Sequence, residues 1–255
     1  MVLRITRSII PNLFTLANLF SGFLAVVHFA HALKEPPYVI VGAYYVLAAA
    51  IFDMLDGIVA RLARAASELG VELDSLCDIV SFGVAPSVLL YVLHYHGHGP
   101  AGMLIAALPA MAGAYRLARF NVQLTSLEDK QYFRGLPIPA GALTIVSYCL
   151  FYLYTGQIPP AWQEIATNFV TIATALAMVS TVRYDNIPRP SRAAIRQRPV
   201  FTSVFVLAIA AVILSRGQLA FPLMVAYIAF GAIRHAVLQL QEWKKERLTF
   251  EDFED

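Results

Sequence analysis

The stretch DMLDGIVAR at residues 53–61 is followed, after eight further positions, by GVELDSLCD at residues 70–78. These stretches lie where one apolar segment ends and the next begins, so they place four aspartates in or beside membrane helices: Asp53, Asp56, Asp74 and Asp78. Each charged carboxylate at bilayer depth costs a few kcal/mol on insertion scales. A chain that carries four of them needs a compensating partner, and the spacing indicates which one.

The composition supports a membrane protein. Hydrophobic residues make up 58% of the 255-residue chain and charged residues only 14%, whereas soluble domains contain roughly 45–50% and about 25%. The net charge of +2 excludes a strong polyanionic partner, so we expect no nucleic-acid binding. Cys77 and Cys149 both lie in apolar runs and give no reason to expect a disulfide.

Eight segments qualify as membrane spans, since a spanning helix needs about 20 mostly apolar residues. Their approximate ranges are 11–31, 38–63, 74–95, 100–120, 137–156, 164–182, 200–214 and 218–238. We therefore predict an all-α polytopic membrane helix bundle, a single catalytic domain over residues 1–255 with a short tail at 241–255. The first segment is long and lacks a clear cleavage site, so we expect no cleaved signal peptide.

The distribution of basic residues predicts the orientation. With eight spans both termini lie on one side, and all of the 19 Lys and Arg residues except Lys34 and Arg216 fall on that side. Cytoplasmic loops carry the excess of Lys and Arg. We therefore expect both termini and the aspartates to face the cytoplasm of the cell membrane.

The spacing of the aspartates predicts a metal site. Asp53 and Asp56 are three residues apart, and Asp74 and Asp78 are four apart, so each pair shares one helix face. A short connection lets the two helices run antiparallel and bring the carboxylates together. Hard oxygen ligands suit Mg²⁺ or Mn²⁺. Two such ions, roughly 3.5–4 Å apart, clamp a displacement reaction at phosphorus.

Small and basic residues beside the aspartates fit a phosphorylated ligand. Gly57 and Ala60 open one helix face to a ligand, and Arg61 can form paired hydrogen bonds with a phosphate. Gly70 permits the turn into the next helix, and Ser67 is a further phosphate donor. An ion-coupled transporter that uses aspartates as a relay is the competing interpretation.

The pattern D-x-x-D-G-x-x-A-R-x8-G-x3-D-x3-D, from Asp53 to Asp78, resembles the complete signature of the CDP-alcohol phosphotransferase family. The resemblance implies a dimeric membrane fold with a six-helix core, here about residues 9–183, and a cytoplasm-facing site for two metal ions. It implies that Asp53, Asp56 and Asp74 bind one metal ion and that Asp53, Asp74 and Asp78 bind the second. Asp78 matches the catalytic general base. The CDP and diphosphate contacts would be Gly57, Ala60, Arg61, Ser67 and Gly70.

Outside the signature the sequence is similar to the branch of this family that uses serine, the integral-membrane phosphatidylserine synthases. The similarity lies in residues 11–18, 72–86, 116–121 and 133–140. It implies CDP-diacylglycerol and L-serine as substrates and phosphatidylserine and CMP as products. Asn12, Thr15 and Asn18 recur at three-residue spacing on the first helix. They would contact the cytidine or line the site, or else join helices. The candidates for binding the serine carboxylate or a lipid phosphate are Arg116, Arg119, Lys130 and Arg134.

Several alternatives stay open on the sequence. The same machinery could use glycerol phosphate or inositol phosphate as acceptor, or an ether-lipid donor with serine, which would make archaetidylserine. A prenyltransferase also carries aspartate-rich metal motifs, although Gly57, Ala60 and Arg61 favour the CDP-alcohol family. The segments at about 200–240 carry no motif that indicates a role.

Overall fold

The computed structural model describes residues 2–63, 67–125, 135–182, 184 and 199–251. Within these ranges the chain forms helices joined by short turns and contains no strand, in agreement with the all-α prediction. The long helices are α1 (Val2–His31), α2 (Tyr38–Ala63), α3 (Glu68–Asp78), α4 (Ala85–Leu93), α5 (Gly99–Thr125), α6 (Ile138–Tyr148), α7 (Pro160–Val179), α9 (Pro199–Leu214) and α10 (Ala220–Glu251). Two π-helical segments, Ile79–Val84 and Cys149–Leu153, extend α3 and α6.

Among the described residues, five helical stretches have the length and composition to cross a membrane: Ile9–His31, Tyr38–Ala63, Glu68–Leu93, Gly99–Val122 and Ala220–Gln241. The apolar helices Ile138–Leu153 and Thr202–Leu214 are shorter. The structure therefore supports a multi-pass membrane protein. The predicted span near 164–182 corresponds to α7, whose buried Thr167, Thr171 and Thr174 make it less apolar.

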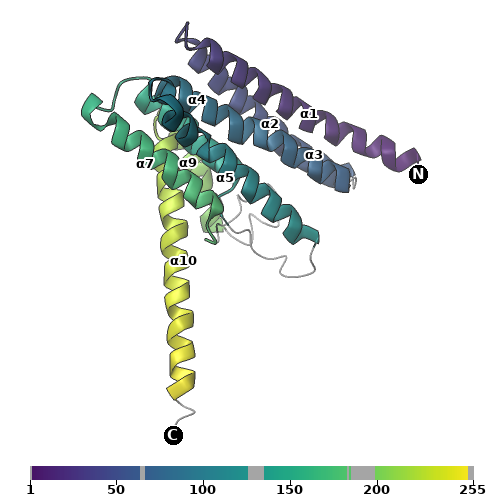
Figure 1. The fold of residues 1–255 in the computed structure, drawn as a ribbon. Helices are drawn as coiled ribbons and strands as arrows, with labels where there is room; N and C mark the ends of the chain where they lie inside the picture. The colour runs from purple at the N-terminus through teal and green to yellow at the C-terminus, as the bar shows by residue number, and fades with distance from the viewer. Residues whose placement is uncertain (1, 64–66, 126–134, 183, 185–198, 252–255) are drawn as a thin grey trace.

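α1, α2 and the continuous rod formed by α3, the first π-helical segment and α4 lie side by side (Figure 1). α1 packs along α2 after a tight turn at residues 32–37, and it also packs against α3, the first π-helical segment and α4. Close packing depends on small residues: a Cβ atom on Gly42 of α2 would overlap the ring of Phe29 of α1. This arrangement brings the start of α1, the end of α2 and the start of α3 to one end of the bundle.

The second half of the chain packs on the other side of the α3–α4 rod. α5 contacts α4, α7 and the first π-helical segment, while α6 contacts α7 and α10. α10 continues well beyond the other helices toward the C-terminus (Figure 1). The core that joins these helices includes the fully buried Phe82, Leu89, Ile138, Ile145 and Met178.

The π-helical segment Ile79–Val84 begins directly after Asp78. π-helical turns inside α-helices are rare and often lie at functional sites. Here the segment places Ser81 against α1, where its Oγ donates a 3.0 Å hydrogen bond to the backbone oxygen of Asn18. Gly22 of α1 permits this approach, because a Cβ atom there would overlap Ser81. The segment therefore fixes α1 beside the aspartates.

Candidate metal centre and substrate pocket

Three of the four predicted aspartates form one cluster. Ligand oxygens of Asp53 and Asp56, from α2, and of Asp74, from α3, all lie within 4.8 Å of one another. Asp56 is buried, and the other two are partly buried. The shared faces that the spacing predicts are therefore present, and the two helices bring them together as expected.

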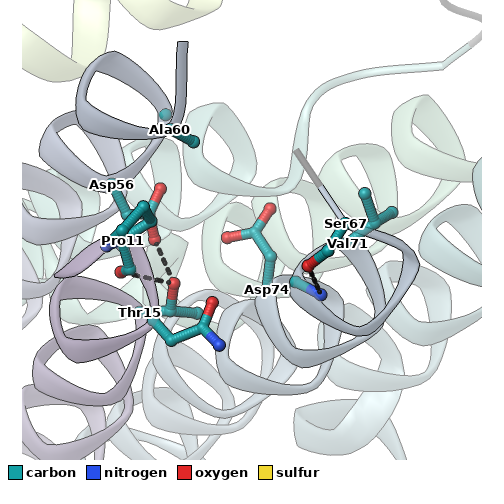
Figure 2. A pocket seen from close by; sticks show the side chains of 10 residues that line it. Pro11, Thr15, Asp56, Ala60, Ser67, Val71 and Asp74 are labelled. Carbon is teal, nitrogen blue, oxygen red and sulfur yellow. Dashed lines mark hydrogen bonds between the residues drawn. The ribbon is translucent and has the colours of Figure 1, made fainter. Parts of the chain in front are cut away.

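Asp56 is held by α1. The Oγ1 of Thr15 donates a 2.8 Å hydrogen bond to Oδ2 of Asp56, and it lies 3.2 Å from the backbone oxygen of Pro11 (Figure 2). Thr15 is itself buried. Its hydroxyl therefore orients one carboxylate of the cluster while the other oxygen of Asp56 stays available.

Asp78 lies one turn beyond Asp74 and outside the three-carboxylate cluster. Its side chain is only 7% exposed, and its Oδ1 accepts a 3.0 Å hydrogen bond from Nδ2 of Asn18. The negative charges of Asp53 and Asp74 act on it electrostatically. The structure thus brings three aspartates together and leaves the fourth beside them, because Asn18 holds one of its oxygens. Metal binding by Asp78 stays a prediction.

The cluster fits divalent cations. Within the described ranges, no Lys or Arg forms an ion pair with Asp53, Asp56 or Asp74, although Arg61 acts on Asp56 at longer range. Oδ1 of Asp74 is buried and has no hydrogen-bond partner. Uncompensated carboxylates and an orphaned oxygen in the interior are costly. An all-oxygen donor set of this kind suits Mg²⁺ or Mn²⁺.

A pocket of about 500 Å³ opens beside the cluster. Its walls come from the start of α1, the end of α2 and the start of α3, and Figure 2 shows Asp56 and Asp74 on its two sides. The lining residues are Pro11, Asn12, Thr15, Asp56, Gly57, Ala60, Ser67, Gly70, Val71 and Asp74. All predicted CDP contacts except Arg61 therefore surround one pocket. Pro11 and Val71 also line the pocket, although neither was predicted as a ligand contact.

The α3 end of the pocket is the N-terminus of a helix. Ser67 is the N-cap of α3, and its Oγ accepts a 3.1 Å hydrogen bond from the backbone N–H of Gly70. Ser67 therefore starts the helix, and the phosphate contact expected of its hydroxyl stays a prediction. Backbone N–H groups at a helix N-terminus favour anions.

The predicted basic residues behave differently from one another. Arg61 is exposed on α2, near the pocket. Arg116 is buried on α5, whereas Arg119 donates hydrogen bonds of 2.9 and 3.0 Å to the backbone oxygens of Val179 and Ser180. Arg119 thereby holds the C-terminal end of α7. Lys130 and Arg134 lie outside the described residues.

Two further polar contacts were not predicted. Asn18 on α1 binds Asp78, and Asn121 on α5 contacts both Ser75 and Glu72 of α3. The three-residue recurrence of Asn12, Thr15 and Asn18 along the first helix was the signal available for Asn18. Nothing in the sequence indicated which aspartate it would contact.

The chain is similar in sequence to known proteins. Residues 8–182 match the CDP-alcohol phosphatidyltransferase family. A CDP-diacylglycerol–serine O-phosphatidyltransferase of Helicobacter pylori is 36% identical over 179 residues, which are 70% of this chain and 73% of the relative. A protein of the same name from Methanocaldococcus jannaschii is 30% identical over 226 residues, or 89% of this chain and 94% of the relative.

An archaetidylserine synthase of Methanothermobacter thermautotrophicus is 33% identical over 180 residues, covering 70% of each chain. The family match at residues 8–182 includes the whole aspartate motif, the pocket, and the helices from residue 8 of α1 to the end of α7. The family match covers well over half of the chain, and it agrees with the carboxylate cluster and the adjoining pocket. The chain belongs to the CDP-alcohol phosphatidyltransferase family.

Proposed function

We propose that this protein is a phosphatidylserine synthase, which transfers the phosphatidyl group of CDP-diacylglycerol to the hydroxyl of L-serine and releases CMP. The observation that carries the proposal is the junction of the Asp53–Asp56–Asp74 cluster with the pocket of α1, α2 and α3. The choice of serine is supported by relatives of that name at 30–36% identity.

The donor nucleotide would occupy the pocket, with Asn12 and Thr15 on the α1 side and Gly57 and Ala60 on the α2 side. Arg61, Ser67 and Gly70 would contact the diphosphate. Because Gly57 and Gly70 lack side chains, the nucleotide can approach the backbone of α2 and the N-terminus of α3. The acyl chains would extend into the bilayer.

The aspartate cluster would hold two divalent cations, with Asp53, Asp56 and Asp74 binding one and Asp53, Asp74 and Asp78 the other. Bound there, the cations would neutralise the diphosphate and stabilise the charge that develops on the departing CMP. Asp78 would accept the proton of the serine hydroxyl. The serine oxygen then forms a bond to the β-phosphorus as the bond between that phosphorus and the oxygen of CMP breaks.

We further propose that the chain crosses the cell membrane eight times, with both termini and the active site on the cytoplasmic side, and that it acts as a homodimer. The asymmetric distribution of Lys and Arg supports the orientation. Cysteine accessibility tests it: a single cysteine introduced at Lys34 or Arg216 should react with an impermeant reagent from outside intact cells. Labelling only after lysis would contradict the orientation.

Product analysis tests the acceptor and the donor. The purified protein receives CDP-diacylglycerol or its ether-lipid analogue, together with L-serine, glycerol 3-phosphate or inositol phosphate. Mass spectrometry then identifies the lipid formed. We expect phosphatidylserine from the diacyl donor and serine. Product only with a phosphorylated acceptor would overturn the serine assignment, and a marked preference for the ether lipid would favour archaetidylserine synthesis, the activity named for one relative.

A further inference from the structure

Arg116 is a buried cation that forms no ion pair with any residue the structure describes. Its side chain on α5 is 9% exposed, and its Nε is buried without a hydrogen-bond partner. Across the described part of the chain, its guanidinium makes no hydrogen bond and no ion pair, and its one ring contact is Phe120, 5.8 Å from the ring centroid. Burying an unpaired charge is costly unless an anion is supplied.

Two charged residues act on the guanidinium of Arg116. α5, which carries Arg116, packs against α3 and the π-helical segment that follows Asp78. Asp78 attracts the guanidinium of Arg116 and Arg119 repels it. Arg116 and Asp78 nevertheless form no ion pair with each other, and Asp78 instead bonds to Asn18. The proposed base and the buried cation therefore belong to one electrostatic neighbourhood but are not neutralised by direct contact.

Arg116 and Asp78 do not line the nucleotide pocket, but Asp74, one turn before Asp78, does, so this neighbourhood adjoins the pocket. An acceptor must place its hydroxyl at Asp78, and L-serine also carries a carboxylate on the adjacent carbon. A guanidinium offers two parallel N–H donors that match a carboxylate. We propose that Arg116 binds the carboxylate of the acceptor amino acid while the hydroxyl of that amino acid lies against Asp78. This inference rests on the proposed function.

Arg119 is less suited to the same role. Two of its nitrogens already donate to the backbone oxygens of Val179 and Ser180, where they hold the end of α7. Among the described residues, Arg116 is the buried guanidinium near Asp78, and its single charge matches a singly charged carboxylate better than a phosphate dianion, which the negative charge of Asp78 would also repel. This match favours an amino acid over a phosphorylated alcohol at Arg116.

α10 borders the same neighbourhood. Tyr184 is 7% exposed, its ring lies 5.6 Å from that of Tyr227, and a Cβ atom on Gly231 would overlap it. Tyr184 and Tyr227 thus form a packed wall from outside the family-matched range of residues 8–182.

Kinetics of Arg116→Gln test the inference. The KM for L-serine should rise about 10- to 100-fold, the loss expected for a charge-assisted hydrogen-bonded pair. The KM for CDP-diacylglycerol should stay unchanged, and the stabilisation of the protein by L-serine in a thermal-shift assay should disappear. A raised KM for CDP-diacylglycerol would instead assign Arg116 to a lipid phosphate. A lower kcat with both KM values unchanged would also overturn the inference.

Ser87→Ala is the matched control, because Ser87 on α4 is buried and its Oγ accepts a 3.2 Å hydrogen bond from the backbone N–H of Ala110 on α5. It loosens α5 without changing its charge, so both KM values should stay at their wild-type values. Arg116→Lys keeps the charge and loses the paired donors, and it should show a smaller rise in the KM for serine.

A measurement on the wild-type protein protects the test if the Arg116 variants do not fold. L-Alanine keeps the carboxylate and lacks the hydroxyl, and L-alaninamide lacks both. L-Alanine should compete with L-serine at least tenfold better than the amide; equal competition would overturn the inference. If the wild-type protein transfers phosphatidyl groups only to another alcohol, the proposed function fails. If the enzyme uses serine but L-alaninamide inhibits it as well as L-alanine does, the role of Arg116 fails and the proposed function stands.

Discussion

Nδ2 of Asn18 lies 3.0 Å from Oδ1 of Asp78 and joins α1 to the end of α3 inside the bundle. Asn18 is fully buried, and its backbone oxygen accepts a further hydrogen bond from Ser81 of the π-helical segment. One asparagine therefore connects the proposed base to the rare helical turn that follows it. We infer that Asn18 directs the other oxygen of Asp78 toward the acceptor hydroxyl.

Asn18→Leu keeps the side-chain size and removes the amide. We expect kcat to fall about 10- to 100-fold, as for other groups that orient a reactive ligand, with little change in the KM for CDP-diacylglycerol. Steady-state kinetics with both substrates measure this separation. Ser21→Ala is the control, since Ser21 is buried on the same helix and bonds only to its own backbone at Ala17. An equal fall in kcat in both variants would show that Asn18 only packs the helices and does not orient Asp78.

Asp53→Asn and Asp74→Asn should abolish transfer, because each removes a charge from the carboxylate cluster. They should also weaken Mn²⁺ binding, which electron paramagnetic resonance measures without any turnover. Asp78→Asn should abolish transfer while CDP-diacylglycerol still binds, because Asp78 lies outside the pocket lining. Normal turnover in any of the three variants would contradict the proposed mechanism.

Thr15→Val removes the hydroxyl that donates to Asp56 and keeps the shape of the side chain. Partners that orient metal ligands contribute about 10- to 100-fold to metal affinity or activity. We therefore expect the Mn²⁺ concentration for half-maximal activity to rise by at least tenfold, while saturating Mn²⁺ restores most of the rate. A titration of activity against Mn²⁺ decides this, and an unchanged midpoint would assign Thr15 to the nucleotide instead.

Tyr95→Phe tests the far end of the bundle. The hydroxyl of Tyr95 donates a 2.7 Å hydrogen bond to Oδ1 of Asn168 on α7 and lies 3.4 Å from Oγ1 of Thr171. Losing it should cost about 1 kcal/mol and lower Tm by about 2–4 °C. Activity at 25 °C should not change, because no carboxylate of the cluster is involved. A loss of activity without a loss of Tm would connect this end to the site.

Spacing in the sequence was sufficient for the carboxylate cluster, whereas the pocket residues were expected from the residue types beside it and from the family resemblance. Asp53 with Asp56, and Asp74 with Asp78, share helix faces that follow from three- and four-residue intervals. The helix starts were harder to predict. α3 begins at Glu68 and not near residue 74, because Ser67 caps it while Glu68 and Glu72 lower the local hydropathy. α1 likewise begins at Val2, ahead of its apolar segment.

Contacts between distant segments could not be predicted. The bond from Asn18 to Asp78 depends on the rotation of α1 about its own axis, and the role of Arg119 depends on where α7 ends. Arg116 and Arg119 are three residues apart on α5 and look equivalent in sequence. Only the packing of the helices shows that Arg119 is hydrogen-bonded to the end of α7, whereas the buried Nε of Arg116 has no hydrogen-bond partner among the described residues.

The most direct test is CMP release by the purified, detergent-solubilised protein with CDP-diacylglycerol and Mg²⁺ or Mn²⁺, with and without L-serine. The account predicts CMP release that depends on serine, that stops with EDTA and that returns when the metal is restored. No CMP with any acceptor alcohol, from protein shown to be folded, would contradict it and favour an ion-coupled transporter.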